Sequence, residues 1–72
     1  MIVIQNSVWR ADCIACIHMD EEDEGEELHV LPVGLGYEDT IDYEYESRKE
    51  LIADFKKIVA QWEAELRAGS AK

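Results

Sequence analysis

The clearest pattern of hydrophobic positions covers residues 47–68. When residues are placed every 100° around a helical axis, the large apolar side chains of this segment fall within an arc of about 120°. They are Leu51, Ile52, Phe55, Ile58, Val59, Trp62 and Leu66. Ser47 followed by Glu50 matches the capping box at a helix start, and Gly69 stands where a helix often ends. The pattern predicts an amphipathic helix over residues 47–68 and a tail over residues 69–72.

The preceding part of the chain favours strands. Residues 40–46 alternate apolar Ile41, Tyr43 and Tyr45 with acidic positions, which is typical of a half-buried strand. Residues 13–19 and 28–33 are richer in apolar side chains and predict two more strands. Pro32 assigns the second of them to a sheet edge or a bulge. Residues 1–4 predict a fourth strand, whereas the sequence does not assign residues 8 and 9.

Together these elements predict a single α+β domain over residues 1–72. An antiparallel meander of three or four strands fills residues 1–46, and the helix packs across it. One helix covers only one face of a sheet, yet residues 13–19 and 28–33 are apolar on both faces. The sheet must either curl toward a barrel or be covered by a second copy. We favour the second copy and expect a homodimer, whose assembly or folding should be disrupted by Ile17→Asp or Leu31→Asp.

Charge divides the chain as sharply as hydropathy does. The net charge is −10, and thirteen of the seventeen Asp and Glu residues precede Arg48. Such a surface repels nucleic acid and anionic membranes and attracts basic proteins. No apolar stretch reaches the roughly 18 residues of a membrane span, and no basic region introduces an apolar leader. With only two cysteines, we expect a cytoplasmic protein that binds neither nucleic acid nor membranes directly.

Two motifs suggest metal binding at first sight. Cys13 and Cys16 have Cys-x-x-Cys spacing, but on a strand they point to opposite faces, so we expect two packed thiols. The acidic run that begins at Asp20 resembles the first half of a calcium loop, but Leu31 stands where that loop needs a bidentate glutamate. We therefore expect no metal and no cofactor.

The sequence contains no grouping typical of an enzyme. It has no glycine-rich phosphate loop and no Ser/His/Asp pattern, and the acids look too exposed for acid–base catalysis. His18 and His29 flank the acidic run and are placed to face each other across a hairpin. We expect no catalytic residues.

The chain resembles the small acidic proteins that phages encode as inhibitors of bacterial defence systems. The resemblance rests on its size, the run DEEDEGEE, the strand IDYEYE and the predicted layout. Many of these inhibitors imitate the charge of DNA, and others are oligomeric sponges for nucleotides. The resemblance implies a non-enzymatic protein that occupies the basic, nucleic-acid-binding surface of a host nuclease or defence effector. No functional residue is carried over from it.

The acids themselves supply the candidate contacts. The expected partner-binding residues are Asp20, Glu21, Glu22, Asp23, Glu24, Glu26, Glu27, Asp42, Glu44 and Glu46. The alternative is an oligomeric nucleotide binder that holds an anion with Arg48 and Lys49, since a helix N-terminus offers free N–H groups. The acidic run could also be no more than a solvated loop.

Overall fold

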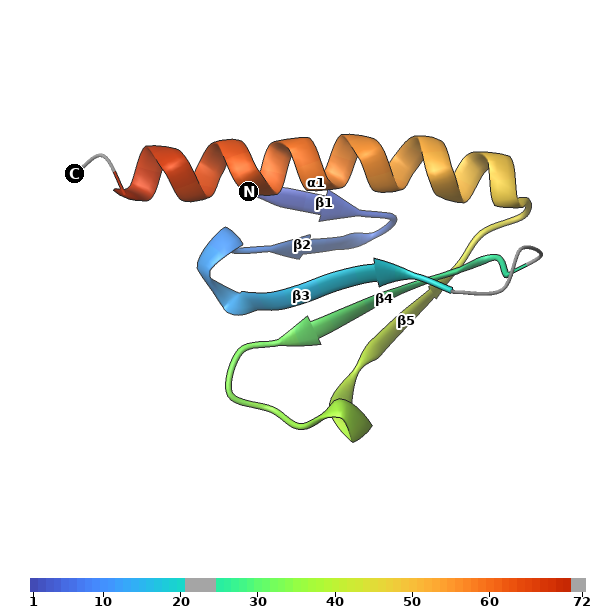
Figure 1. Cartoon of the computed structure of the whole chain (residues 1–72), viewed down its shortest axis with the longest axis horizontal. Helices are drawn as coiled ribbons and strands as arrows, with labels where there is room; N and C mark the ends of the chain where they lie inside the picture. Colours follow the sequence, from blue (N-terminus) through green and yellow to red (C-terminus); the bar gives the residue numbers. More distant parts are fainter. Residues whose placement is uncertain (21–24, 71–72) are drawn as a thin grey trace.

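The α+β architecture predicted from the sequence is confirmed. The computed structural model describes residues 1–20 and 25–70. Within that part of the chain, β3 (Ile14–Met19), β4 (Glu27–Pro32) and β5 (Ile41–Glu44) form an antiparallel sheet in the order β3-β4-β5. The helix α1 (Arg48–Ser70) packs on one face of this sheet (Figure 1).

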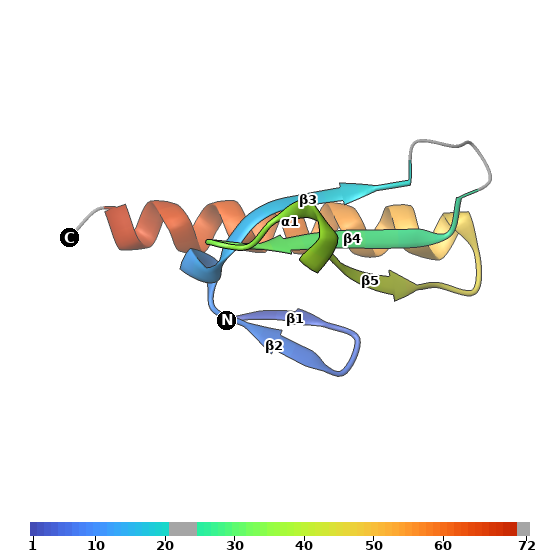
Figure 2. The same cartoon turned by 90° about the horizontal axis from the view of Figure 1, so that it is seen from below.

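The N-terminal strand does not join the meander as a fourth strand. Instead β1 (Ile2–Ile4) and β2 (Ser7–Trp9) form their own antiparallel hairpin. Viewed from below, this hairpin lies beside β5, on the side of the molecule away from β3 (Figure 2). The Gln5 side chain at its turn donates to the Glu44 carbonyl (2.6 Å), and the Trp9 indole donates to the Tyr43 hydroxyl (2.9 Å). These two bonds attach the hairpin to β5.

The core lies between α1, the hairpin and the inner face of the sheet. Its buried side chains are Ile2, Ile4, Ile14, Ile17, Leu28, Val30, Tyr43, Leu51 and Ile58. A chain this short buries a limited fraction of its surface, so each of these side chains carries a large share of the stability. Ile17 is 9% exposed and belongs to this core, so Ile17→Asp should disrupt folding, whereas Leu31 is half-buried on the outer face of the sheet.

The helix follows the predicted pattern closely. The Ser47 hydroxyl accepts a hydrogen bond from the Glu50 backbone N–H (3.2 Å), which is half of the expected capping box. Leu51 and Ile58 are buried, and the other members of the apolar arc flank them. The helix does not stop before Gly69 but continues to Ser70. Among the described helices, none is both long enough and apolar enough to cross a membrane.

The strands differ from the predicted ranges by one or two residues at several ends: β3 begins at Ile14 rather than at residue 13, β4 spans Glu27–Pro32 rather than 28–33, and β5 spans Ile41–Glu44 rather than 40–46. Cys13 ends the short 3₁₀ helix η1 (Ala11–Cys13) and precedes β3. The strand β4 is central, so Pro32 does not mark an edge strand. It is the last residue of β4, where a missing N–H costs little, and it faces the irregularity between Ile14 and Cys16 in β3. Of the two alternatives that the sequence offered for Pro32, a sheet edge or a bulge, the structure shows a register irregularity opposite Pro32 and a central position for β4.

Candidate functional site

The outer face of the three-stranded sheet carries a row of polar side chains centred on His29. In the strand register His18 faces His29, and His29 faces Asp42, so the three residues form one row across β3, β4 and β5. The two imidazole rings lie 4.9 Å apart between centroids, tilted by 35°. The sequence-based expectation that the two histidines face each other is confirmed.

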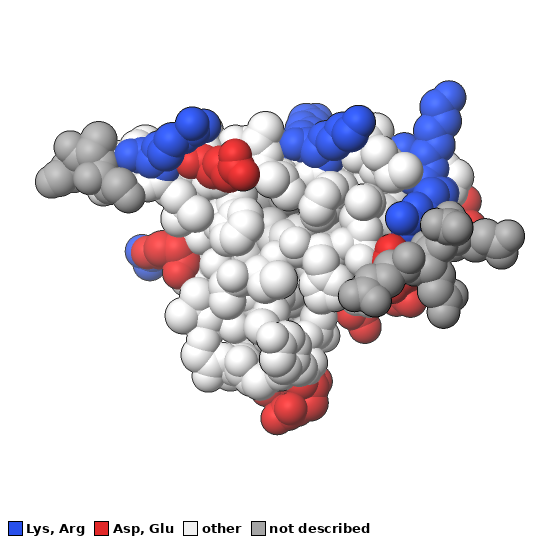
Figure 3. Space-filling view, viewed as in Figure 1, with Lys and Arg blue, Asp and Glu red and all other residues white. Residues whose placement is uncertain are grey.

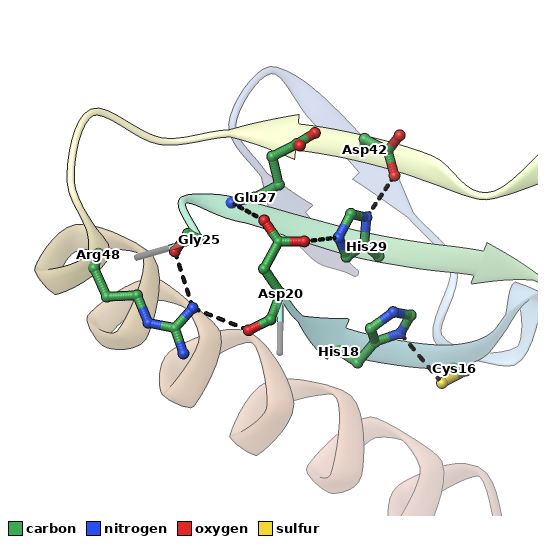
Figure 4. Close-up of polar contacts among 8 residues, drawn as sticks. All are labelled: Cys16, His18, Asp20, Gly25, Glu27, His29, Asp42 and Arg48. Atoms are coloured by element: carbon green, nitrogen blue, oxygen red, sulfur yellow. Dashed lines mark hydrogen bonds and ion pairs between the residues drawn. The ribbon is translucent and has the colours of Figure 1, made fainter. Parts of the chain in front are cut away.

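Two carboxylates hold the His29 ring from opposite sides (Figure 4). Its Nε2 lies 2.5 Å from Asp20 Oδ1, and its Nδ1 lies 2.6 Å from Asp42 Oδ1. A neutral imidazole has only one N–H, so both nitrogens can donate to carboxylates only when His29 is an imidazolium. Partial burial opposes that charge, but the hydrogen bonds to Asp20 and Asp42 outweigh it and raise the pKa of His29.

Asp20 has a second role, which is to close the β3–β4 hairpin. Its Oδ2 accepts the Glu27 backbone N–H (3.2 Å), and its own backbone N–H donates to the Glu27 carbonyl (3.1 Å). The hydrogen bond from His29, together with the contact to Glu27, lowers the pKa of Asp20 despite partial desolvation. The carboxylate therefore stays ionised and fixes the base of the hairpin.

Arg48 completes this arrangement from the first turn of α1. Its Nη1 donates to the Asp20 carbonyl (3.0 Å) and to the Gly25 carbonyl (2.9 Å), so one guanidinium joins the residue that follows β3 to the chain just before β4 (Figure 4). Sequence reasoning missed this contact and offered Arg48 with Lys49 as an anion site. Because the Arg48 side chain binds these two carbonyls, Lys49 is the exposed member of that pair.

The predicted acidic residues fall into three groups. Asp20 and Asp42 bind His29, so their charge is partly compensated within the protein. Glu26, Glu27 and Glu44 lie where β4 begins and β5 ends, which we call the open end of the β4–β5 ladder. Glu46 is exposed beyond the last residue of β5. The remaining four, Glu21, Glu22, Asp23 and Glu24, lie outside the described residues. The expected row of three acids on one strand is therefore reduced to Asp42 and Glu44.

Glu27 and Glu44 are direct cross-strand partners in the β4–β5 register. Opposing like charges weaken a strand pair, so this pairing has a cost in the isolated protein. A shallow recess of about 370 Å³ opens beside them. The described residues that line it include no base: they are Asp20, Gly25, Glu26, Glu27, Glu44 and Tyr45.

The two cysteines differ in exposure and in their neighbours. Cys13 is exposed at the end of η1, whereas Cys16 is half-buried on β3 with its Sγ 3.9 Å from His18 Nδ1. Within residues 1–20 and 25–70, no three His, Cys, Asp or Glu side chains are grouped so as to hold a metal ion. Asp20 and Asp42 contact opposite ring nitrogens, so they cannot share one ion with a single nitrogen of His29.

A comparison of the chain with protein-family models, curated proteins and solved structures finds no match. The geometry of the site is therefore the basis for any functional argument.

Proposed function

We propose that this protein is a non-enzymatic acidic interaction protein, which presents the open end of its β4–β5 ladder to a basic surface of a partner protein. A nucleic-acid-binding groove of a host nuclease or defence effector is the surface with matching chemistry, because it is built to hold closely spaced negative charges. In this proposal the protein acts in the cytoplasm, where such partners operate.

The observation that carries the proposal is the Glu27–Glu44 pair. The two glutamates face each other with no compensating base in the adjoining recess, as far as its described lining extends. A basic side chain from a partner would relieve their repulsion and gain two charge-assisted contacts at once. The anchored hairpin base supports this function, since His29 and Arg48 fix the backbone that carries these acids and so reduce the ordering cost of binding.

The nucleotide-binding alternative gains no support from the geometry. It requires a free cationic cluster at the start of α1, but Arg48 is bound to the Asp20 and Gly25 carbonyls. Lys49 alone is a weak anchor for a phosphate, because a single exposed charge is strongly screened.

The test compares two double variants of equal charge. Glu27→Gln with Glu44→Gln removes the pair, and Glu50→Gln with Glu63→Gln removes two exposed acids of α1. The wild-type protein first captures partners from host lysate, and each captured protein is identified and purified. Its dissociation constant is then measured for both variants at low and high salt, with duplex DNA as competitor.

The proposal expects the Glu27/Glu44 variant to bind at least about tenfold more weakly, a loss of about 1.4 kcal/mol. The helix variant should bind nearly as tightly as the wild type, and DNA should displace the protein. If both variants bind alike at every salt concentration, or if DNA does not compete, the acidic end is not the binding surface and the proposal is wrong.

A further inference from the structure

The strand β3 is an open edge of the three-stranded sheet. It pairs with β4 on one side only, because the hairpin lies beside β5 at the other edge (Figure 2). Proteins usually protect such an edge with charged side chains, proline or a short strand. β3 is six residues long and contains neither a charged residue nor a proline, and its one protective feature is the irregularity at Ala15. Among the described residues, the backbone N–H and C=O groups of β3 that point away from β4 therefore pair with no other strand.

The middle part of the α1 flank next to this edge is apolar. The opposite flank faces the hairpin and β5: Gln61 and Glu65 bind Met1, and Asp54 accepts a hydrogen bond from Tyr45. At 100° per residue, Ile52 and Val59 lie about 160° from Asp54 and Gln61, so they are on the β3 side of the helix. Both are half-buried, and with Phe55 they form an apolar strip above the open edge.

The surface that combines this strip with the β3 edge is almost free of charge. In Figure 3, Lys and Arg side chains follow the top of the helix with an acidic group beside them, other acidic groups lie at the rim, and a broad uncharged area occupies the centre. This area is unusual on a chain in which 33% of residues are charged. A basic partner would find no opposite charge here, whereas two copies with net charge −10 can approach each other with their acids held apart.

We propose that two copies of the chain associate through this face, with β3 pairing antiparallel to β3 of the second copy about a twofold axis. The two sheets then form one continuous sheet, and the apolar strips of the two α1 helices meet on the same side of it. This arrangement replaces the predicted dimer through the outer sheet face, where His18, His29 and Asp42 lie. It goes beyond the proposed function, because the acidic end stays outside the interface.

A second copy fits this face better than an isolated peptide strand. The β3 edge is about 20 Å long, so a strand added to it covers little area by itself. The helix is about 35 Å long, and only a partner with its own apolar helix covers the strip above the edge. A stable interface buries about 800 Å² per partner, so both elements are needed. A twofold axis through β3 supplies both from one sequence.

The first test is the molar mass in solution, measured by sedimentation equilibrium over a wide range of protein concentrations. We expect the mass to reach twice the 8.3 kDa of the chain. Val59→Lys places a charge in the strip and should weaken the dimer at least about tenfold. Ala60→Lys adds the same charge at an exposed neighbouring position and should leave the dimer unchanged. A chain that stays monomeric at millimolar concentration overturns the proposal.

A second measurement does not depend on any variant remaining folded. Hydrogen exchange of the wild-type protein should slow in residues 14–19 as concentration rises through the dimer range, while exchange in the β1–β2 hairpin stays constant. Ala15→Lys, at an exposed position on β3, should remove this concentration dependence. If the protein dimerises but exchange in β3 does not respond, or if Val59→Lys and Ala60→Lys dimerise equally, the copies meet elsewhere and the proposal is wrong. Neither measurement involves the acidic end. The dimer proposal can therefore fail while the proposed function stands, and the reverse is also true.

Discussion

The two faces of the three-stranded sheet are built from alternate residues of the same strands, yet different forces hold them. On the inner face Leu28 and Val30 are fully buried against α1 and the hairpin. On the outer face their neighbour His29 is 17% exposed and held by Asp20 and Asp42. Hydrophobic burial is non-directional and independent of protonation, whereas the His29 contacts depend on both geometry and pH. The inner face therefore provides most of the stability of the fold, and the outer face positions the β3–β4 hairpin with its acidic residues.

Replacing a core residue of the inner face should have the largest effect. We expect Leu28→Ala to lower the free energy of unfolding by about 2–5 kcal/mol, because it removes buried methyl groups and leaves a cavity. That is a large share of the stability of so small a domain. Urea unfolding followed by circular dichroism measures the loss.

Leu31→Ala is the matched control, since Leu31 lies on the outer face of the same strand and is only half-buried. Leu31→Ala should lower the free energy of unfolding clearly less than Leu28→Ala does. Equal losses would mean that the two faces contribute alike, which would contradict the distinction drawn between them.

Removing the central side chain of the outer face should have a smaller and more local effect. We expect His29→Gln to reduce the free energy of unfolding by well under half the loss of Leu28→Ala, because ionic contacts near the protein surface contribute little. The main change should appear at the hairpin base, where the Glu27 backbone N–H bonds Asp20. Hydrogen exchange of that amide should speed up in His29→Gln but much less in His18→Gln. Unchanged exchange at Glu27 in His29→Gln would show that Asp20 and Arg48 fix the base of the β3–β4 hairpin without His29.

The sequence predicted the inner face far better than the outer one. Helical and strand periodicity identified α1 and the three main strands, because burial repeats along the chain. The placement of His18 opposite His29 also followed from the hairpin pattern. The hydrogen bonds of His29 to Asp20 and Asp42 could not be predicted from the sequence. They depend on the β4–β5 register and on the course of the chain after β3. Seventeen acids offered too many equivalent candidates for this role.

Two other features were missed for the same reason, which is that they depend on contacts between residues distant in the sequence. Arg48 lies in the first turn of α1, and its contact with the Asp20 and Gly25 carbonyls spans more than twenty residues of sequence. No local pattern encodes such a contact. The separation of β1 and β2 from the meander was equally hidden, because Ile2 and Ile4 have the same alternation in a hairpin as in a larger sheet. Pattern identifies which residues are buried, but not which strand they pair with.

The pH dependence of stability should separate the two faces without changing the core. The pKa of His29 is raised above its ordinary value of 6.5. Its contribution to the free energy of unfolding is therefore complete below pH 6.5 and is lost as pH rises through the raised pKa. The pKa of Asp20 is lowered from 3.8, so its contribution is complete above pH 3.8 and is lost as pH falls through the lowered pKa. Both contributions are therefore complete between about pH 3.8 and pH 6.5.

The measurement is urea unfolding of the wild type and His29→Gln across this range and beyond both ends. The difference in unfolding free energy between the two proteins should form a plateau between those pH values and decline on either side. Leu28→Ala should instead differ from the wild type by a nearly constant amount, because no proton is involved. A difference between wild type and His29→Gln that is flat from acid to alkaline pH would contradict the ionised Asp20–His29–Asp42 arrangement.

The smallest expected effect is a gain in stability at the acidic end. Glu44→Gln removes the charge that opposes Glu27 across the β4–β5 ladder while keeping the length and polarity of the side chain. Relief of a cross-strand repulsion is worth roughly 0.2–1 kcal/mol, and the exposure of Glu44 favours the lower end of that range. Glu46→Gln removes the same charge beyond the end of β5 and should change stability less. The gain should shrink as salt is added, since screening already weakens the repulsion in the wild type. A loss of stability in Glu44→Gln at low salt would mean that the Glu27–Glu44 pair carries no cost in the free protein, and the argument that this end is kept acidic for a partner would lose its physical basis.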